Sequence, residues 1–156
     1  MIKYILIILL FLIILIVIAF MVLGYRSRSG RPPGMEEGRL TECPDTPNCV
    51  CSEYKGDTAH YIAPLAVPDI TDDTGNILIE AIKEAGGTIK TENRDYIAAV
   101  FSSSVFGFVD DLEVRIDKNK NEIQFRSASR VGYSDMGVNR KRVESIKALF
   151  LSKIKR

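Results

Sequence analysis

The chain has 156 residues, and 21 lysines and arginines against 20 aspartates and glutamates give a formal net charge of +1. A charge this close to zero gives no basis for nucleic-acid binding, which uses a strongly basic surface, so we expect no nucleic-acid partner. Beyond the N-terminal segment, the length allows one small domain.

The first segment, residues 1–25, is a candidate membrane anchor. No residue from Tyr4 to Tyr25 carries a charge, and this run of 22 residues measures about 33 Å as a helix, enough to cross a hydrocarbon core of about 30 Å. A cleaved signal peptide is the rival interpretation, with Val22–Gly24 as its cleavage site, but the apolar core exceeds the usual length of about 7–15 residues. We therefore predict a retained single-pass anchor that contacts the membrane through residues 4–25.

Residues 26–42 are rich in glycine, proline, serine and charge, which predicts a flexible tether. The tether places Arg26, Arg28 and Arg31 on the C-terminal side of the anchor. By the positive-inside rule, these arginines hold the soluble part in the cytoplasm.

The predicted domain, residues 43–156, opens with three cysteines that argue the opposite way. Cys43 and Cys49 enclose five residues, two of them proline, and a disulfide across this stiff loop would add about 2 kcal/mol of stability. Because disulfides persist only in oxidising compartments, we expect the soluble domain on the exported side, with Cys51 as a leftover thiol. Three unpaired thiols in a cytoplasmic domain remain the alternative. A Cys3His zinc set with His60 matches no known spacing, and we expect this histidine to be packed or hydrogen-bonded.

The rest of the domain reads as a helix, a group of strands and a second helix, from apolar spacings of 3.6 and 2 residues. This order predicts an α+β domain: an antiparallel sheet of about four strands with two helices packed on it, preceded by one N-terminal transmembrane helix. The expected elements are a helix between Asp73 and Gly86, strands at Thr88–Thr91, Tyr96–Phe101, Leu112–Asp117 and Glu122–Ser127, and a helix from Val138 to Ile154.

The last two strands are expected to form a hairpin. If Asp117 pairs with Glu122, Glu113 falls opposite Arg126. We expect this opposite-charge pair on the solvent face of the sheet, where it would contribute up to about 1 kcal/mol.

Five stretches of sequence also carry a resemblance to a known family. They are CPDTPNCVCS (43–52), HYIAPL (60–65), DYIAAVFSS (95–103), FGFVDDLEVRI (106–116) and RSASRVGYSDMGVNRKRVE (126–144). In this order they resemble the domain-of-unknown-function family number 1499, over about residues 40–150. The resemblance implies a fold unit without an assigned activity, and the export or membrane signals of many members imply an exported domain. The chain departs from the family at Cys51, where serine is usual.

The main candidate site is the turn between Arg126 and Arg142, which holds four arginines. Guanidinium groups and the free amides of a helix N-terminus both bind carboxylates and phosphates. We therefore predict a non-enzymatic binding module for an anionic ligand or an acidic partner. Pairing of these arginines with carboxylates of the same fold stays open as the alternative. The residues expected to bind the ligand are Arg126, Ser129, Arg130, Tyr133, Asp135, Asn139 and Arg140.

Two further functions are compatible with the sequence. A metal-assisted or acid–base hydrolytic enzyme would use Asp110, Asp111 and Asp135, with a divalent cation or His60. A purely structural membrane-tethered protein would use its arginines and carboxylates only to neutralise one another. We rank binding above both, so the sequence predicts no catalytic residue, no cofactor and no metal site.

Overall fold

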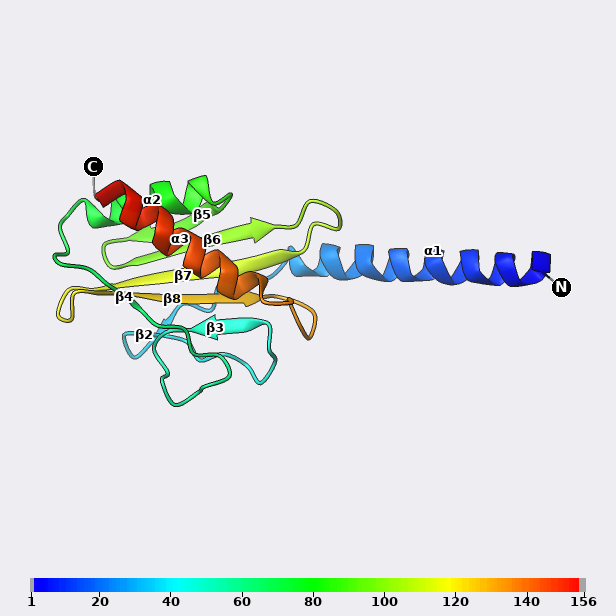
Figure 1. Ribbon diagram of the computed structural model, residues 1–156, viewed down its shortest axis with the longest axis horizontal. Helices are drawn as coiled ribbons and strands as arrows, with labels where there is room; N and C mark the ends of the chain where they lie inside the picture. The colour runs from blue at the N-terminus through cyan, green and yellow to red at the C-terminus, as the bar shows by residue number, and fades with distance from the viewer. Residues whose placement is uncertain (1, 155–156) are drawn as a thin grey trace.

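The computed structural model describes residues 2–154; residues 1 and 155–156, at the outer ends of the predicted anchor and domain, lie outside the described residues. Helix α1, Ile2–Ser27, projects away from a body of strands and helices (Figure 1). Its 26 residues are long and apolar enough to cross a membrane, and none of its most apolar stretch is buried against the rest of the described chain. The chain therefore fits a single-pass membrane protein.

The body is an α+β fold built on an antiparallel sheet. Its four longer strands are neighbours in chain order: β5 (Thr88–Asn93) at one edge, then β6 (Tyr96–Ser102), β7 (Val109–Asp117) and β8 (Glu122–Ser129). Two short strands, β3 (Cys49–Cys51) and β4 (Leu65–Ala66), pair with the outer edge of β8. The prediction of about four strands is therefore wrong, because the sheet has six strands within residues 2–154. Strands of two or three residues are too short to show an alternating pattern.

The register of the central hairpin agrees with the prediction. Asp117 lies opposite Glu122, and Glu113 lies opposite Arg126. Both members of the second pair are buried, with Glu113 fully so. The expectation of a solvent face is therefore wrong, and the reason is the segment that covers this side of the sheet.

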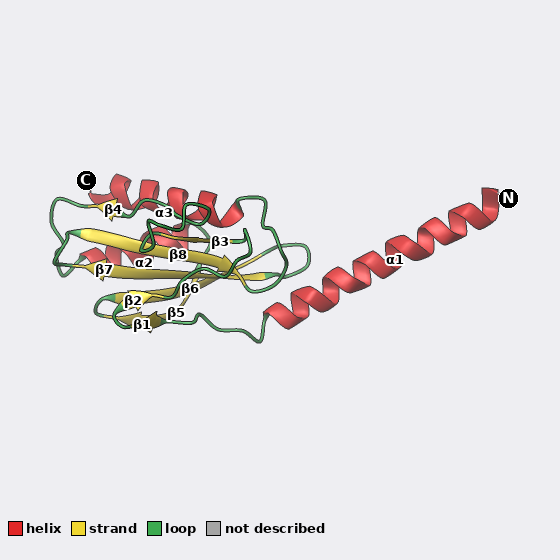
Figure 2. Cartoon of the chain, turned by 90° about the horizontal axis from the view of Figure 1, so that it is seen from below, coloured by secondary structure: helices red, strands yellow, loops and turns green. Residues whose placement is uncertain are grey.

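That segment is the predicted tether. After α1 the chain runs along the sheet to a small ladder of β1 (Met35–Glu36) and β2 (Arg39–Leu40) (Figure 2). Leu40 is fully buried and packs in a cluster with Cys51 and Tyr96. The amide of Gly34 also donates a hydrogen bond of 2.8 Å to Glu113 Oε1. Residues 34–40 are thus a cover over one face of the sheet.

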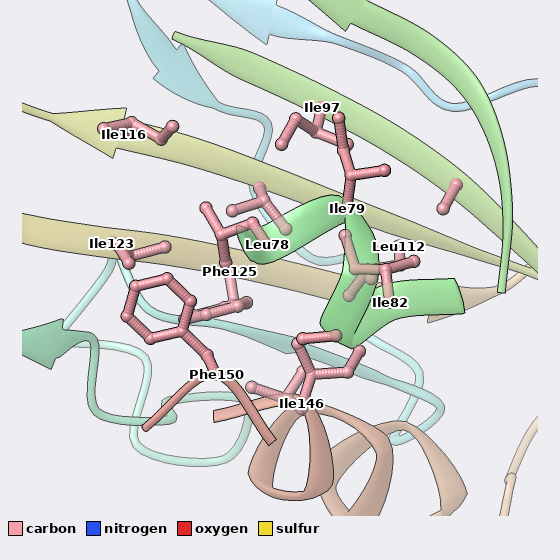
Figure 3. Packing of buried hydrophobic residues seen from close by; sticks show 14 of the residues in the cluster. Leu78, Ile79, Ile82, Ile97, Leu112, Ile116, Ile123, Phe125, Ile146 and Phe150 are labelled. Atoms are coloured by element: carbon pink, nitrogen blue, oxygen red, sulfur yellow. The ribbon is translucent and has the colours of Figure 1, made fainter. Parts of the chain in front are cut away.

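The two remaining helices cover the other face and close the main core. They are α2, Thr74–Glu84, and α3, Val138–Ile154, and α3 has the predicted bounds. Phe150 and Ile146 of α3 pack toward Phe125 of β8 (Figure 3). Fully burying a side chain of this size contributes about 1.5–3 kcal/mol. This hydrophobic layer holds the sheet and α3 in a fixed relation.

The segment before β3 contains the predicted disulfide. Cys43 and Cys49 are bonded, with their Cα atoms 5.7 Å apart, which lies in the usual range. Cys51 is a free, buried thiol. The imidazole of His60 is hydrogen-bonded on both sides, from Nδ1 to Asp57 Oδ2 at 2.6 Å and from Nε2 to the Thr46 carbonyl at 3.1 Å. A zinc set of these residues is therefore not formed.

The end of α1 is packed against the body. Gly24 and Ser27 are buried there, and a Cβ atom at Gly24 would collide with the carbonyl oxygen of Phe106. The hydroxyl of Ser27 accepts a 3.0 Å hydrogen bond from the amide of Val109, the first residue of β7. The ring of Phe20 stacks on that of Phe106, with 5.2 Å between centroids. The anchor helix and the β6–β7 loop therefore form a joined unit.

Candidate functional site

The alternation of side chains along the strands separates the arginines of the predicted turn. Arg126 and Arg130 lie on the covered face of the sheet, where their carboxylate partners project from β7. Arg142 lies on the opposite face, beneath α3. Arg140 is exposed and donates a 2.9 Å hydrogen bond to the carbonyl of Tyr61. The four guanidinium groups therefore do not share one recess.

The first pair, Arg126 with Glu113, is a buried polar cluster. Arg126 Nη1 lies 3.0 Å from Glu113 Oε2, and the hydroxyl of Tyr96 donates to Glu113 Oε1 at 2.7 Å. Burial raises the pKa of the Glu113 carboxyl, and the hydrogen bond from Tyr96 and the charge of Arg126 offset part of that rise. Burial and the bond to Glu113 likewise raise the pKa of Tyr96. Glu113, Arg126 and Tyr96 are all buried, and the cover formed by residues 34–40 closes the cluster to a ligand.

The second pair, Arg130 with Asp111, joins the sheet to the anchor. Arg130 donates to both oxygens of the Asp111 carboxylate, at 2.9 Å from Nε and 2.6 Å from Nη2. Its remaining nitrogen, Nη1, donates to the carbonyl of Ser27 at 3.1 Å. The last carbonyls of a helix have no partner within the helix and attract cations. Arg130 therefore ties the C-terminus of α1 to β7.

The third arginine, Arg142, belongs to a network beneath α3. Its Nη2 donates to Asp110 Oδ2 at 2.6 Å, and its Nη1 donates to the side chains of Ser127 and Asn139. The side chain of Asn139 also donates to Ser129 Oγ at 3.0 Å. This network connects α3 to the end of β8.

Two of the predicted binding residues, Asp135 and Tyr133, lie in the loop before α3 and not in these arginine networks. Asp135 accepts hydrogen bonds from the backbone amides of Gly137 and Asn139, at 3.0 and 2.6 Å, and so caps the start of α3. Tyr133 is 71% exposed at the tip of the same loop. Ligand binding by the predicted set stays a prediction, and the geometry distributes its members over separate places.

The acidic residues of the enzymatic alternative are separated in the same way. Asp110 and Asp111 pair with arginines on opposite faces of the sheet, and Asp135 caps a helix. His60 is bonded to Asp57. Within residues 2–154, no three His, Cys, Asp or Glu side chains are grouped so as to hold a metal ion. The arrangement offers no shared position for a cation or a substrate.

A different concave site lies where the anchor meets the covered face. This anchor-side hollow has a volume of about 440 Å³. Its cations are Arg28 and Arg31 from the predicted tether (residues 26–42), Lys90 from β5, and Arg130 just after β8. Its other lining residues are Gly30, Pro32, Thr91, Val100, Ser102 and Val109. No carboxylate lines this hollow among the described residues.

The charge of the hollow is largely uncompensated. Arg130 is neutralised by Asp111, but Arg28, Arg31 and Lys90 form no ion pair within residues 2–154. Four other hollows of the described surface each include carboxylates in their lining.

Sequence reasoning missed most of this site. It used Arg28 and Arg31 only for membrane orientation, and a single lysine in a short strand gives no signal. Arg130 is the one predicted binding residue that lines the hollow.

The fold and the hollow define a class of protein, an α+β domain carried on a candidate membrane-spanning helix. The family model described as "Protein of unknown function (DUF1499)" matches residues 39–150, and the chain belongs to this family. Neither the search of curated proteins nor the search of solved structures gives a match. The matched residues include the six-stranded sheet, α2, most of α3 and Arg130, whereas Arg28 and Arg31 precede them.

Proposed function

We propose that the protein is a membrane-anchored, non-enzymatic binding module that holds an anionic ligand in the anchor-side hollow. The observation that carries the proposal is the lining itself, which brings Arg28, Arg31 and Lys90 together without a carboxylate. Cations that lack partners inside the protein are available to a ligand. In a concave site they also focus the electrostatic potential and raise the local concentration of anions.

The shape and the neutral groups of the hollow fit a small ligand. Its volume of about 440 Å³ lies at the small end of the range for ligand sites, about 300–1,000 Å³. Arginine forks from one wall and an ammonium group from the other would bind a phosphate or carboxylate from two sides. Thr91 and Ser102 add hydroxyl groups to the lining. The ligand class is the one predicted from the sequence, at a site that shares only Arg130 with the predicted set.

The proposal is tested by titrating the full-length protein, in nanodiscs of neutral phosphatidylcholine, with inorganic phosphate and pyrophosphate. Calorimetry would measure the dissociation constants of the wild type and of Arg31→Gln and Lys90→Gln. Both side chains are exposed, so the fold should tolerate the changes. We expect each variant to bind pyrophosphate about tenfold more weakly, because a charge-assisted hydrogen bond contributes about 1.5 kcal/mol.

Lys55→Gln and Lys120→Gln are the matched controls, since both lysines line a different hollow that also contains Glu53 and Asp117. These variants should bind as the wild type does. Absence of binding by the wild type, or an equal loss in the controls, would contradict the proposal.

A further inference from the structure

Exposed apolar side chains outside α1 gather at one end of the body. Val105, Tyr133 and Met136 are 79%, 71% and 91% exposed, the highest values among the large apolar residues of the body. Val105 lies in the β6–β7 loop, residues 103–108, and the other two lie in the β8–α3 loop, residues 130–137. Both loops project on the side from which α1 leaves (Figures 1 and 2). Two loops that carry the most exposed apolar side chains of the body at one end are a candidate interaction surface.

Contacts with α1 indicate how deep the β6–β7 loop would lie in a membrane that α1 spans. The rings of Phe106 and Phe108 lie 5.2 and 6.1 Å from the ring of Phe20. Phe20 precedes Tyr25, the last residue of the uncharged run, by about 7–8 Å along the helix axis. A hydrocarbon core of about 30 Å takes up about 20 of the apolar residues of α1. If α1 spans a bilayer, these two phenylalanines therefore lie closer to the middle of the bilayer than Arg26, the first charged residue after the uncharged run.

The second loop lies at the same end, as its contacts show. Arg130, at its start, donates hydrogen bonds to the carbonyls of Ser27 and Arg28 at the end of α1. The only carboxylate of this loop, Asp135, is occupied by two backbone amides. The exposed Arg26 and Arg28 at the end of α1, together with apolar loop tips at the same end of the body, match the headgroup and acyl levels of a membrane interface.

We infer that loops 103–108 and 130–137 dip into the membrane interface beside α1, with Val105, Phe106, Phe108, Tyr133 and Met136 as the inserted side chains. The partner of this surface is the interfacial lipid of the bilayer that holds the anchor. The inference rests on the membrane span included in the proposed function, but it is independent of the anionic ligand. Its consequence is a body held in one orientation, with the anchor-side hollow at headgroup level.

The absence of tryptophan from the sequence allows single-tryptophan reporters. Val105→Trp and Tyr133→Trp would be placed in the full-length protein, each alone, in vesicles of lipids brominated near the headgroup end of the acyl chain. We expect both reporters to emit at shorter wavelength than a solvent-exposed tryptophan and to lose most of their emission to bromine quenching. Lys120→Trp, in the exposed turn at the far end of the sheet, should lose none.

Phe11→Trp, in the exposed middle of α1, separates the inference from the span on which it rests. Deeply brominated lipids should quench this reporter. Quenching of Phe11→Trp without quenching of Val105→Trp and Tyr133→Trp would overturn the inference and leave the span in place. A blue-shifted but unquenched Val105→Trp would mean that protein covers the loop, which also overturns it. If deeply brominated lipids do not quench Phe11→Trp, α1 does not span the bilayer, and the inference fails with it.

Discussion

The most deeply buried ion pair among the described residues is that of Glu113 with Arg126. Both side chains are buried, and Arg126 Nε has no hydrogen-bond partner among the described residues. Removing an ion from water costs several kcal/mol, and attraction to its partner offsets this cost only when the geometry of the pair is good. The sequence predicted the pairing from the strand period, but it could not show the burial. That depends on residues 34–40, which the sequence describes as a polar tether.

We predict different effects on stability for substitutions of the two partners. Because the pKa of Glu113 is raised above its ordinary value of 4.5, the folded state holds its proton more tightly than the unfolded state. The contribution of Glu113 to the free energy of unfolding therefore falls as pH rises from about 4.5 through the raised pKa. Glu113→Gln should remove this fall. Arg126→Met should lower the free energy of unfolding by about 3 kcal/mol at neutral pH, since it leaves a buried carboxylate unpaired.

Urea unfolding of both variants, followed by circular dichroism between acid and neutral pH, would measure these effects. Glu92→Gln, at an exposed position of β5, is the control and should keep the wild-type pH dependence. An Arg126→Met variant as stable as the wild type at neutral pH would show that the pair is not closed to water.

A second prediction at this scale concerns the Cys51 thiol. It is 2% exposed, and burial raises its pKa, against a smaller lowering by Arg126. Since the thiolate is the reactive form, a maleimide should label the folded protein far more slowly than the unfolded protein. Mass spectrometry should find one label after denaturation without reductant, and none in Cys51→Ser. Rapid labelling under native conditions would contradict the buried position.

At the scale of elements, the spacing of apolar residues predicted the long helices and strands well. The 17 residues of α3 and the register of β7 with β8 agree with the prediction. The strands β3 and β4 were missed because three and two residues cannot show a period. The helix α2 begins after Asp73 as expected, but Asp73 makes no side-chain cap hydrogen bond. Its carboxylate accepts instead from Asn76 Nδ2, at 3.0 Å.

The candidate site was less predictable than these elements. The sequence placed four arginines near one turn, but neighbouring strand positions face opposite sides of a sheet. Arg130 and Arg142 therefore meet Asp111 and Asp110 on different faces. The anchor-side hollow combines Arg31 with Lys90, and no local pattern connects residues so distant in sequence.

The packing of α1 on the β6–β7 loop gives a prediction at this scale. Gly24 permits a close approach to the Phe106 carbonyl, so Gly24→Val should separate the helix from the loop while the body stays folded. The backbone from Arg26 to Arg31 would then open more often, and trypsin should cleave it faster. Gel electrophoresis over a time course would measure the rate. Ala19→Val, at an exposed position of α1, should be cleaved at the wild-type rate, and equal rates in both variants would contradict the packing.

For the whole molecule, direct contacts join the anchor, the segment that follows it and the body. Arg130 bonds to the end of α1, the Gly34 amide bonds to Glu113, and Leu40 is buried under the sheet. An anionic ligand in the hollow would therefore contact both the segment that follows the span and the sheet. Binding there would strengthen the attachment of the body to its anchor, because the ligand would join Arg31 to Lys90.

Two features of the molecule bear on which side of the membrane the body lies, and they favour opposite sides. Arg26, Arg28 and Arg31 follow the anchor, which favours a cytoplasmic body. The Cys43–Cys49 disulfide requires an oxidising compartment. We expect the disulfide to be decisive, since Arg28 and Arg31 would serve the hollow under the proposed function and a reduced cytosol would not maintain the bond. The body should therefore lie on the exported side.

Labelling of intact cells that express the Cys51→Ser variant would test this expectation, because only the two bonded cysteines remain. A membrane-impermeant maleimide should add no mass before reduction and two labels after treatment with an impermeant reductant. Labels that appear only after the cells are lysed would place the body in the cytoplasm. Labels that appear in intact cells without reductant would show an exported body with an open bridge. In that case the attachment of residues 43–49 to β8, through Cys49 opposite Ala128, would have to hold without the covalent link.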